Sequence, residues 1–292
     1  MTDNSTSPFR LPSRPPATPL GDVAFACPSD TASWLDCVQG CSPEPGPELL
    51  TAWGSGWPDR WTVLRLDADE GWLACPVSEV ADGLFARAES VRRMTNWHGQ
   101  RHRSGIAFMS STGRHHAFES LTEQGVLRMI DFAGPSDLVT QPFRLRWHDG
   151  QRWRAHTPDF LVVEDAGMTV VNVRPAAKVK PEDEEQWTAM TAVATRLGWR
   201  HEVVTGLVQP HGVNVDAMTT GRREVHDPLG LQAALTEVLA DGPVRFGDAV
   251  AATEAPALAR AVLLRMLWTA DAAIDLAVRL TDRSPVRLGS PA

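Results

Sequence analysis

Three carboxylates in the middle of this 292-residue chain are spaced so that they could act on a metal ion together. Glu119 and Glu123 lie four residues apart, and on a helix they would share one face. Asp159 stands just before the apolar run 161–163, which predicts a carboxylate at the start of a strand. An acid on a helix and an acid on a strand can converge at a sheet edge, and carboxylate oxygens suit Mg²⁺ or Mn²⁺.

A polar-x-basic triplet, Asn172-Val173-Arg174, ends the next apolar run of the sequence, and Pro175 follows it. Proline ends a strand because it has no N–H to donate. Together with the acids, the triplet predicts chemistry on phosphodiester bonds. In such a site a divalent ion polarises the scissile phosphate and lowers the pKa of the attacking water.

Five short motifs follow one another in a familiar order: Gly99-Gln100-Arg101-His102, Phe118-Glu119-Ser120, Gln141-Pro142-Phe143, Pro158-Asp159-Phe160 and Val173-Arg174-Pro175. In order and spacing they resemble the restriction-endonuclease-like, or PD-(D/E)xK, nucleases. The nearer resemblance, over residues 90–206, is to TnsA-like endonuclease subunits of heteromeric transposases. It implies an α/β fold with a restriction-endonuclease-like αβββαβ core. It also implies a Mg²⁺-dependent DNA endonuclease that cuts at transposon ends, with an integrase-type transposase subunit and an ATPase regulator as partners.

The resemblance assigns roles to single residues. Glu123 corresponds to the helix acid and Asp159 to the central metal ligand, so both are expected to bind Mg²⁺ or Mn²⁺. The backbone carbonyl of Val173 and the side-chain oxygen of Asn172 complete the implied ligand set. Arg174 is expected to hold the phosphate, because guanidinium binds phosphate oxygens bidentately. The family pattern has an acid or glutamine at position 172 and lysine at position 174, so the sequence departs from it at both.

Further residues are expected to support this site. Glu119 is a candidate for orienting His116 or a metal-bound water, and the alternative is a simple surface charge on the helix. The net charge is −8, yet arginines gather in two stretches, 87–116 and 144–154. A local basic surface on an acidic protein suits guided contact with phosphates, and ordinary solvated faces are the alternative. The residues predicted to contact DNA are Arg101, Arg103, Arg114, Arg144 and Arg154.

Composition and length exclude several classes of protein. With 43% apolar residues the chain can bury a substantial core, and no apolar run approaches the roughly 20 residues that cross a bilayer. We therefore expect a cytoplasmic protein with no membrane partner. The four cysteines show no C-x-x-C spacing, so we expect reduced thiols rather than a zinc site or disulfides.

The sequence preceding the nuclease-like region divides into two parts. Residues 1–22 are rich in proline and poor in hydrophobic residues, which predicts a disordered tail. Residues 23–90 are expected to form an N-terminal extension, in which 61–77 predicts a β-hairpin with an acidic turn.

Residues 91–210 are expected to hold the nuclease core. Apolar residues at helical spacing predict the first of its two helices. A run of acids at the start and a glycine at the end predict the second. The predicted elements are a helix over 118–132, strands over 137–147, 152–163 and 170–173, a helix over 182–198 and a strand over 200–205.

Residues 224–288 predict a winged-helix-like domain, with helices over 229–239, 246–252 and 256–268 and a hairpin over 273–288. Acidic residues dominate around the third helix, so protein docking is a better expectation for this domain than DNA reading.

Two alternatives to the transposase role remain open from the sequence. One is a stand-alone restriction or repair nuclease, and the other is a catalytically silent scaffold that binds DNA or partners on the same core.

Overall fold

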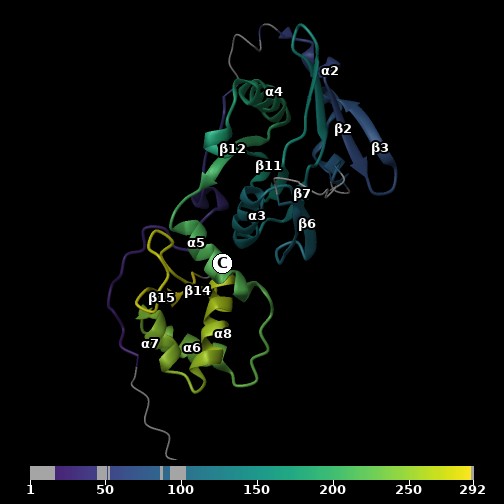
Figure 1. Ribbon diagram of the computed structural model, residues 1–292. Helices are drawn as coiled ribbons and strands as arrows, with labels where there is room; N and C mark the ends of the chain where they lie inside the picture. The colour runs from purple at the N-terminus through teal and green to yellow at the C-terminus, as the bar shows by residue number, and fades with distance from the viewer. Residues whose placement is uncertain (1–16, 45–50, 52, 86–87, 93–102, 291–292) are drawn as a thin grey trace, which may run out of the picture. The chain divides into compact units, whose positions relative to one another are not determined.

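The computed structural model describes residues 17–44, 51, 53–85, 88–92 and 103–290, and they form two compact units (Figure 1). One unit is Ser33–Val215, and the other joins Met1–Ala32 to Asp216–Ala292. Most of the predicted tail, 1–22, lies outside the described residues. The stretch 23–90, which we expected to be one extension, is divided between the two units after Ala32.

The larger unit contains a five-stranded sheet in the order β1-β12-β11-β10-β7. β7 and β10 pair antiparallel, as do β10 and β11, whereas β11 and β12 pair parallel. The parallel pair needs a crossover, and helix α4 (Pro181–Leu197) supplies it. The strands are β1 (Val38–Cys41), β7 (Asp137–Thr140), β10 (Phe160–Glu164), β11 (Gly167–Val173) and β12 (Arg200–Leu207).

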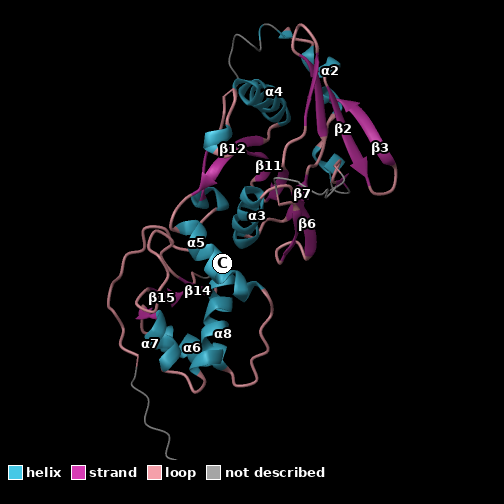
Figure 2. Cartoon of the chain, in the orientation of Figure 1, coloured by secondary structure: helices cyan, strands magenta, loops and turns pink. Residues whose placement is uncertain are grey.

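Two helices, α3 (Leu121–Ala133) and α4 (Pro181–Leu197), lie on opposite sides of this sheet (Figure 2). Ser120 caps α3 by accepting the N–H of Glu123, and Gly134 ends the helix in the left-handed region with φ 68°. Pro181 starts α4, and Gly198 ends it with φ 74°. Both helices lie close to their predicted ranges because these end signals are local in the sequence.

A second sheet has the order β3-β2-β8-β9, with β4 also paired to β2. Its strands are β2 (Thr62–Asp67), β3 (Gly71–Pro76), β4 (Ala88–Glu89), β8 (Arg144–His148) and β9 (Trp153–His156). β2 and β3 confirm the predicted hairpin. The core between this sheet and α4 includes Trp61, Trp147, Leu145 and Met190, all nearly without solvent exposure.

The two long strands predicted over 137–147 and 152–163 are each broken into two. The first breaks at Gln141, whose φ of 48° is left-handed, and Pro142 cannot donate to a ladder. The second breaks at Thr157-Pro158, between β9 and β10. Each half then joins a different sheet, so the chain passes twice between the sheets. Gln141 N donates to Asp159 O at 2.8 Å, which ties the two breaks together.

Shorter elements complete the larger unit. A hairpin of β5 (Gly105–Met109) and β6 (Arg114–Phe118) leads directly into α3. Helix α5 (His211–Met218) follows β12, and the boundary between the two units falls within it, after Val215. The remaining short helices are η1 (Trp34–Cys37), α2 (Trp57–Arg60), η2 (Val77–Glu79), η3 (Asp82–Phe85), η4 (Ala176–Lys178) and η5 (Thr219–Arg222), the last of which lies in the smaller unit.

The smaller unit packs three helices with a three-stranded sheet of order β13-β15-β14. Its segment from the chain's N-terminal part is held by a bidentate pair, since both Arg287 nitrogens donate to Asp30 oxygens at 2.9 and 3.0 Å. The elements are α6 (Leu231–Leu239), α7 (Phe246–Ala251), α8 (Pro256–Trp268), β13 (Val244–Arg245), β14 (Ala272–Ala273) and β15 (Pro285–Leu288). The chain is therefore of mixed α/β class, as predicted. Within the described part of the chain, no helix has the length and apolar character needed to span a bilayer.

Candidate active site

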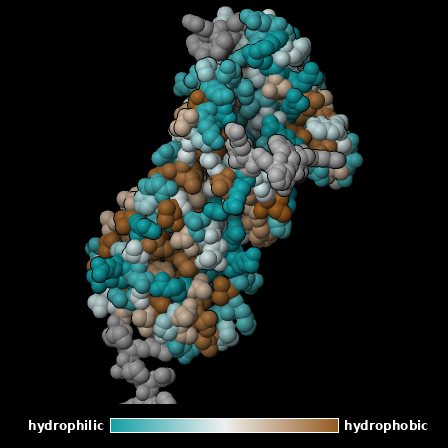
Figure 3. Space-filling view, in the orientation of Figure 1, coloured by the Kyte–Doolittle hydropathy of each residue, from teal (hydrophilic) through white to brown (hydrophobic). Residues whose placement is uncertain are grey.

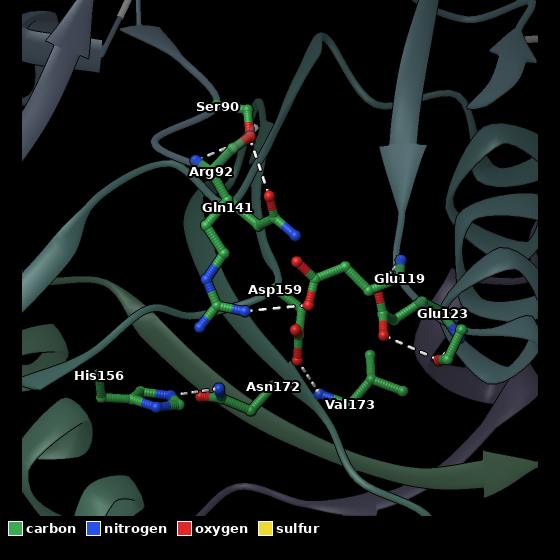
Figure 4. Close-up of polar contacts among 10 residues, drawn as sticks. Ser90, Arg92, Glu119, Glu123, Gln141, His156, Asp159, Asn172 and Val173 are labelled. Carbon is green, nitrogen blue, oxygen red and sulfur yellow. Dashed lines mark hydrogen bonds and ion pairs between the residues drawn. The ribbon is translucent and has the colours of Figure 1, made fainter. Parts of the chain in front are cut away.

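Glu123 lies in the first turn of α3, and its carboxylate is held in place by the start of the helix (Figure 4). One oxygen accepts the hydroxyl of Ser120 at 2.8 Å, and the other accepts the backbone N–H of Glu119 at 2.7 Å. Ser120 Oγ in turn accepts the N–H of Glu123, so the two side chains fix one another at the start of α3. The side chain is only 8% exposed, and burial raises its pKa against those hydrogen bonds.

Asp159 lies between Pro158 and the first residue of β10, at the break between the two sheets. Its backbone is fixed on both sides, because its N–H donates to Val171 O at 3.0 Å and its carbonyl accepts from Gln141 N. Its carboxylate accepts the backbone N–H of Val173 at 2.7 Å. The site is built on sheet backbone rather than on a loose loop.

Glu123 and Asp159 both line a cavity of about 940 Å³. Burial, and next the neighbouring charge of Glu123, raise the pKa of Asp159 to about 8. Two carboxylates that repel one another share a proton at neutral pH. A divalent cation can replace that proton and neutralise both charges, so the donor set fits a hard metal ion. Glu123 and Asp159 were both predicted from the sequence, and in the structure they line the same cavity.

Arg92 is a cation beside this pair, and the sequence motifs did not identify it. Its guanidinium donates to Glu119 at 2.9 Å, and Figure 4 shows both side chains reaching into the space beside Asp159. Its charge lowers the pKa of Asp159 and of Glu123, against the larger effect of burial. The sequence signal was limited to the general density of arginine in this stretch, because Arg92 and Glu119 are far apart in the chain.

Three further basic residues line the same cavity, together with the acids Glu119 and Asp183. They are Arg174, Lys178 and Lys180. Arg174 Nε donates to Asp183 Oδ2 at 2.9 Å, so its charge is partly balanced from the first turn of α4. Asp183 belongs to the acid-rich start that predicts this helix, and it caps α4 by accepting the Lys180 N–H. The same carboxylate also orients Arg174 at the cavity.

Asn172 lies in a chain of side-chain hydrogen bonds. Its Oδ1 lies 2.9 Å from His201 Nε2, and its Nδ2 lies 2.7 Å from His156 Nε2. His201 Nδ1 continues the chain to Thr191 Oγ1 at 2.8 Å. Burial lowers the pKa of His156 to about 4 and that of His201 to about 3, so both rings are neutral at pH 7. Both polar atoms of Asn172 are therefore engaged with imidazoles, and its role as a metal ligand through the second lone pair of Oδ1 stays a prediction.

Other predicted residues lie away from the acid pair. His116, the expected partner of Glu119, is buried on β6 with its Nε2 2.7 Å from Thr112 Oγ1. Burial, and next the charge of Arg114, lower the pKa of His116 to about 4. Glu119 instead pairs with Arg92, so the orienting role proposed between Glu119 and His116 does not match these contacts.

The arginines predicted to contact DNA fall into three groups. Arg101 lies outside the described residues. Arg103 and Arg144 are exposed, and Arg144 lines a second cavity beside the site. Arg114 is paired with Asp137, and Arg154 donates to both Asp149 at 2.6 Å and Glu185 at 3.1 Å, so their charges are already balanced.

Among the residues that the structure describes, no group of three or more His, Cys, Asp or Glu side chains is placed to hold a metal. The acid pair supplies two ligands only, so an ion bound there takes the rest from backbone carbonyls and water, as Mg²⁺ commonly does. Comparison with protein-family models and with curated proteins found no match for this chain.

Proposed function

We propose that this protein is a metal-dependent DNA endonuclease with a restriction-endonuclease-like core, acting as the TnsA-like subunit of a heteromeric transposase at transposon ends. The observation that carries the proposal is the pair of Glu123 and Asp159, in which burial and mutual repulsion raise the pKa of Asp159 to about 8 in a cavity lined by basic side chains. The same cavity brings the acid pair together with the cations Arg92, Arg174, Lys178 and Lys180, a combination that suits a metal ion with a phosphate.

The order of elements supports the same proposal. Helix α3, strands β7, β10 and β11, helix α4 and strand β12 follow one another as αβββαβ, with β8 and β9 inserted between β7 and β10. Asp159 precedes the second of those strands, and Arg174 follows the third. In the smaller unit, three helices followed by paired strands have the order of a winged-helix domain, for which we propose partner docking.

The residues divide the work of the reaction among them. Glu123, Asp159 and the backbone carbonyl of Val173 would hold Mg²⁺ or Mn²⁺, which supplies polarisation of the scissile phosphate and a water of lowered pKa. Arg174 and Arg92 would hold phosphate oxygens, because a guanidinium stays protonated and binds oxygens in pairs. Neither arginine can accept a proton, so they position the phosphate and offset its charge.

The proposed partners follow from the family resemblance: DNA, an integrase-type transposase subunit and an ATPase regulator, all in the cytoplasm. The second candidate function is a silent scaffold on the same core. Three contacts favour it, since Glu123 is held by Ser120 and Glu119 at the start of α3, Asn172 bridges two histidines and Arg174 is paired with Asp183.

Nicking of supercoiled plasmid separates the two functions. The wild-type protein, with and without its candidate transposase partner, is incubated in Mg²⁺, Mn²⁺ or EDTA. The proposal expects cleavage only with metal, and its loss in Asp159→Asn but not in Asp165→Asn, a control acid on the β10–β11 turn that accepts a hydrogen bond from Ser136. Cleavage by Asp159→Asn at the wild-type rate would remove Asp159 from the site, and no cleavage by wild type in the complete assembly would favour the scaffold.

A further inference from the structure

The outer face of the second sheet is the most unusual surface of the larger unit. Neighbouring residues across a sheet share a face, and residues two apart along a strand do so as well. The register pairs Leu66 with Trp72, Leu64 with Arg144, and His148 with Trp153. Two tryptophans therefore lie on the same side of the sheet, and two arginines lie between them. We define this stacking face by Trp72, Arg144, Arg146, His148 and Trp153.

Burial separates this face from the core side of the sheet. Val63, Leu145 and Trp147, which point the other way, are at most 1% exposed. Trp72 is 60% exposed and Trp153 is 55% exposed, although indole is a costly group to leave in water. Hydrophobic residues show in brown over the β2–β3 hairpin in Figure 3. Two indoles kept in solvent on one flat sheet face are typical of a binding surface.

The charge on this face favours an anionic partner. Among the strand residues of this sheet that the structure describes, Arg144, Arg146 and His148 share the face with one acid, Glu89 on β4. The Arg146 guanidinium lies over the Trp153 ring, 5.5 Å from its centroid. The cavities at the two ends of the face have no carboxylate among the described residues that line them. The combination of cations and stacked indoles suits nucleotides, whose bases stack and whose phosphates carry charge.

The face continues into the candidate active site. Trp72 and Arg144 line a cavity of about 350 Å³ together with Arg92, His156 and Gln186. Those three residues also line the cavity of the acid pair. At its other end, Trp153 and His148 line a cavity of about 480 Å³ whose walls include Trp53 and Trp61. Three strand spacings of about 4.8 Å and a register offset of about six residues along the strands separate Trp72 from Trp153 by roughly 25 Å, which several nucleotides of an extended single strand can span.

We propose that this stacking face binds an unpaired DNA strand and leads it to the cavity of Glu123 and Asp159. Unpaired bases expose the π-faces on which indoles stack, whereas a duplex keeps them within its own stack. The inference rests on the proposed function in taking the ligand to be DNA. It adds a binding step that does not require the metal.

The test measures binding of the full chain to fluorescein-labelled oligothymidine and to a duplex of equal length, by fluorescence anisotropy in EDTA. The wild type is expected to bind the single strand at least about 10-fold more tightly. Trp72→Ala and Trp153→Ala should each weaken that binding roughly five-fold or more, the scale of losing one stacked base. Arg144→Gln with Arg146→Gln should reduce the dependence of binding on salt, because fewer phosphates are neutralised.

The control is Ile106→Ala, which removes a side chain 66% exposed on the separate β5–β6 hairpin. Thermal melting checks that every variant is folded, and Trp72→Phe, which keeps an aromatic ring, should retain most of the binding. Absence of oligothymidine binding by wild type, or equal affinities for wild type and the tryptophan variants, would overturn the inference. Tryptophan-dependent binding in a protein that cleaves no DNA would uphold it while refuting the proposed endonuclease.

Discussion

Replacing Asp159 by asparagine should stabilise the metal-free protein at high pH. The new side chain keeps an oxygen to accept the Val173 N–H, and it lacks the charge that repels Glu123. The folded pKa of about 8 lies above the ordinary value of 3.8, so the stability that Asp159 gives relative to asparagine is fully present below pH 3.8. It is lost as pH rises through 8.

The size of this effect follows from the pKa. Between pH 3.8 and about 8, Asp159 is protonated in the folded state but not in the unfolded state. Each pH unit of this interval changes the free energy of unfolding by about 1.4 kcal/mol, so the whole interval gives an upper bound of about 6 kcal/mol. Water in the open cavity screens the repulsion, so we expect about 2 kcal/mol. For a unit of this size that is a rise in Tm of about 4–8 °C.

The assay is thermal melting of both proteins in EDTA at pH 5 and pH 9. The Tm of Asp159→Asn relative to wild type should rise between the two pH values, and Asp165→Asn should show no such rise. If the difference in Tm between Asp159→Asn and wild type were the same at pH 5 and pH 9, the two acids would not repel one another in the folded protein and the reasoning would be refuted.

Of three further predictions, two concern the candidate site and one concerns the smaller unit. Arg174→Ala should lower the rate of plasmid nicking about 100-fold, the scale of losing one preorganised charge. Arg174→Lys should keep measurable activity, and Lys178→Ala and Lys180→Ala should change the rate little. If Arg174→Ala nicked at the wild-type rate and Lys178→Ala did not, the phosphate-binding role would belong to Lys178. Asn172→Ala should lower the free energy of unfolding by about 1–3 kcal/mol in urea titrations, because it leaves two imidazoles without their partner; an unchanged midpoint would contradict the hydrogen-bonded chain. Arg287→Ala should destabilise the smaller unit by about 3 kcal/mol by stranding the Asp30 carboxylate, whereas Arg260→Ala, whose pair with Asp282 is exposed, should cost under about 1 kcal/mol; equal effects on urea unfolding would show that burial of Asp30 does not matter.

Local signals accounted for the elements that the sequence predicted well. Ser120 and Gly134 bound α3, Pro181 and Gly198 bound α4, and the acidic turn of the β2–β3 hairpin lies between alternating apolar residues. Each of these signals acts within a few residues, so the sequence alone is enough to identify it.

The sequence indicates the breaks in the two long strands only in part. Pro142 and Pro158 mark irregular positions, but a proline is compatible with an edge strand or a bulge as readily as with a change of sheet. What decides between these outcomes is the pairing of β8 with β2, far away in the chain, which draws residues 144–148 into a second sheet. The inserted β8–β9 hairpin was missed for that reason.

The candidate site was predictable in its acids and not in its surroundings. Asp159 lies in a recognisable motif and Glu123 takes its role from the family resemblance. The contact of Arg92 with Glu119 and the contact of Asn172 with His201 instead join residues 27 and 29 positions apart. Such contacts depend on which elements pack together. They leave no periodic or short-range trace in the sequence.

Binding of Mn²⁺ to the full-length protein tests the central claim most directly. Isothermal titration calorimetry at about pH 8.5, where Asp159 has lost its proton, should show one site in the wild type, and affinity should fall as pH is lowered below 8. The site should be lost in Asp159→Asn and kept in Asp165→Asn. Absence of Mn²⁺ binding by the wild type, or equal binding by Asp159→Asn, would contradict the claim that Glu123 and Asp159 hold a metal ion.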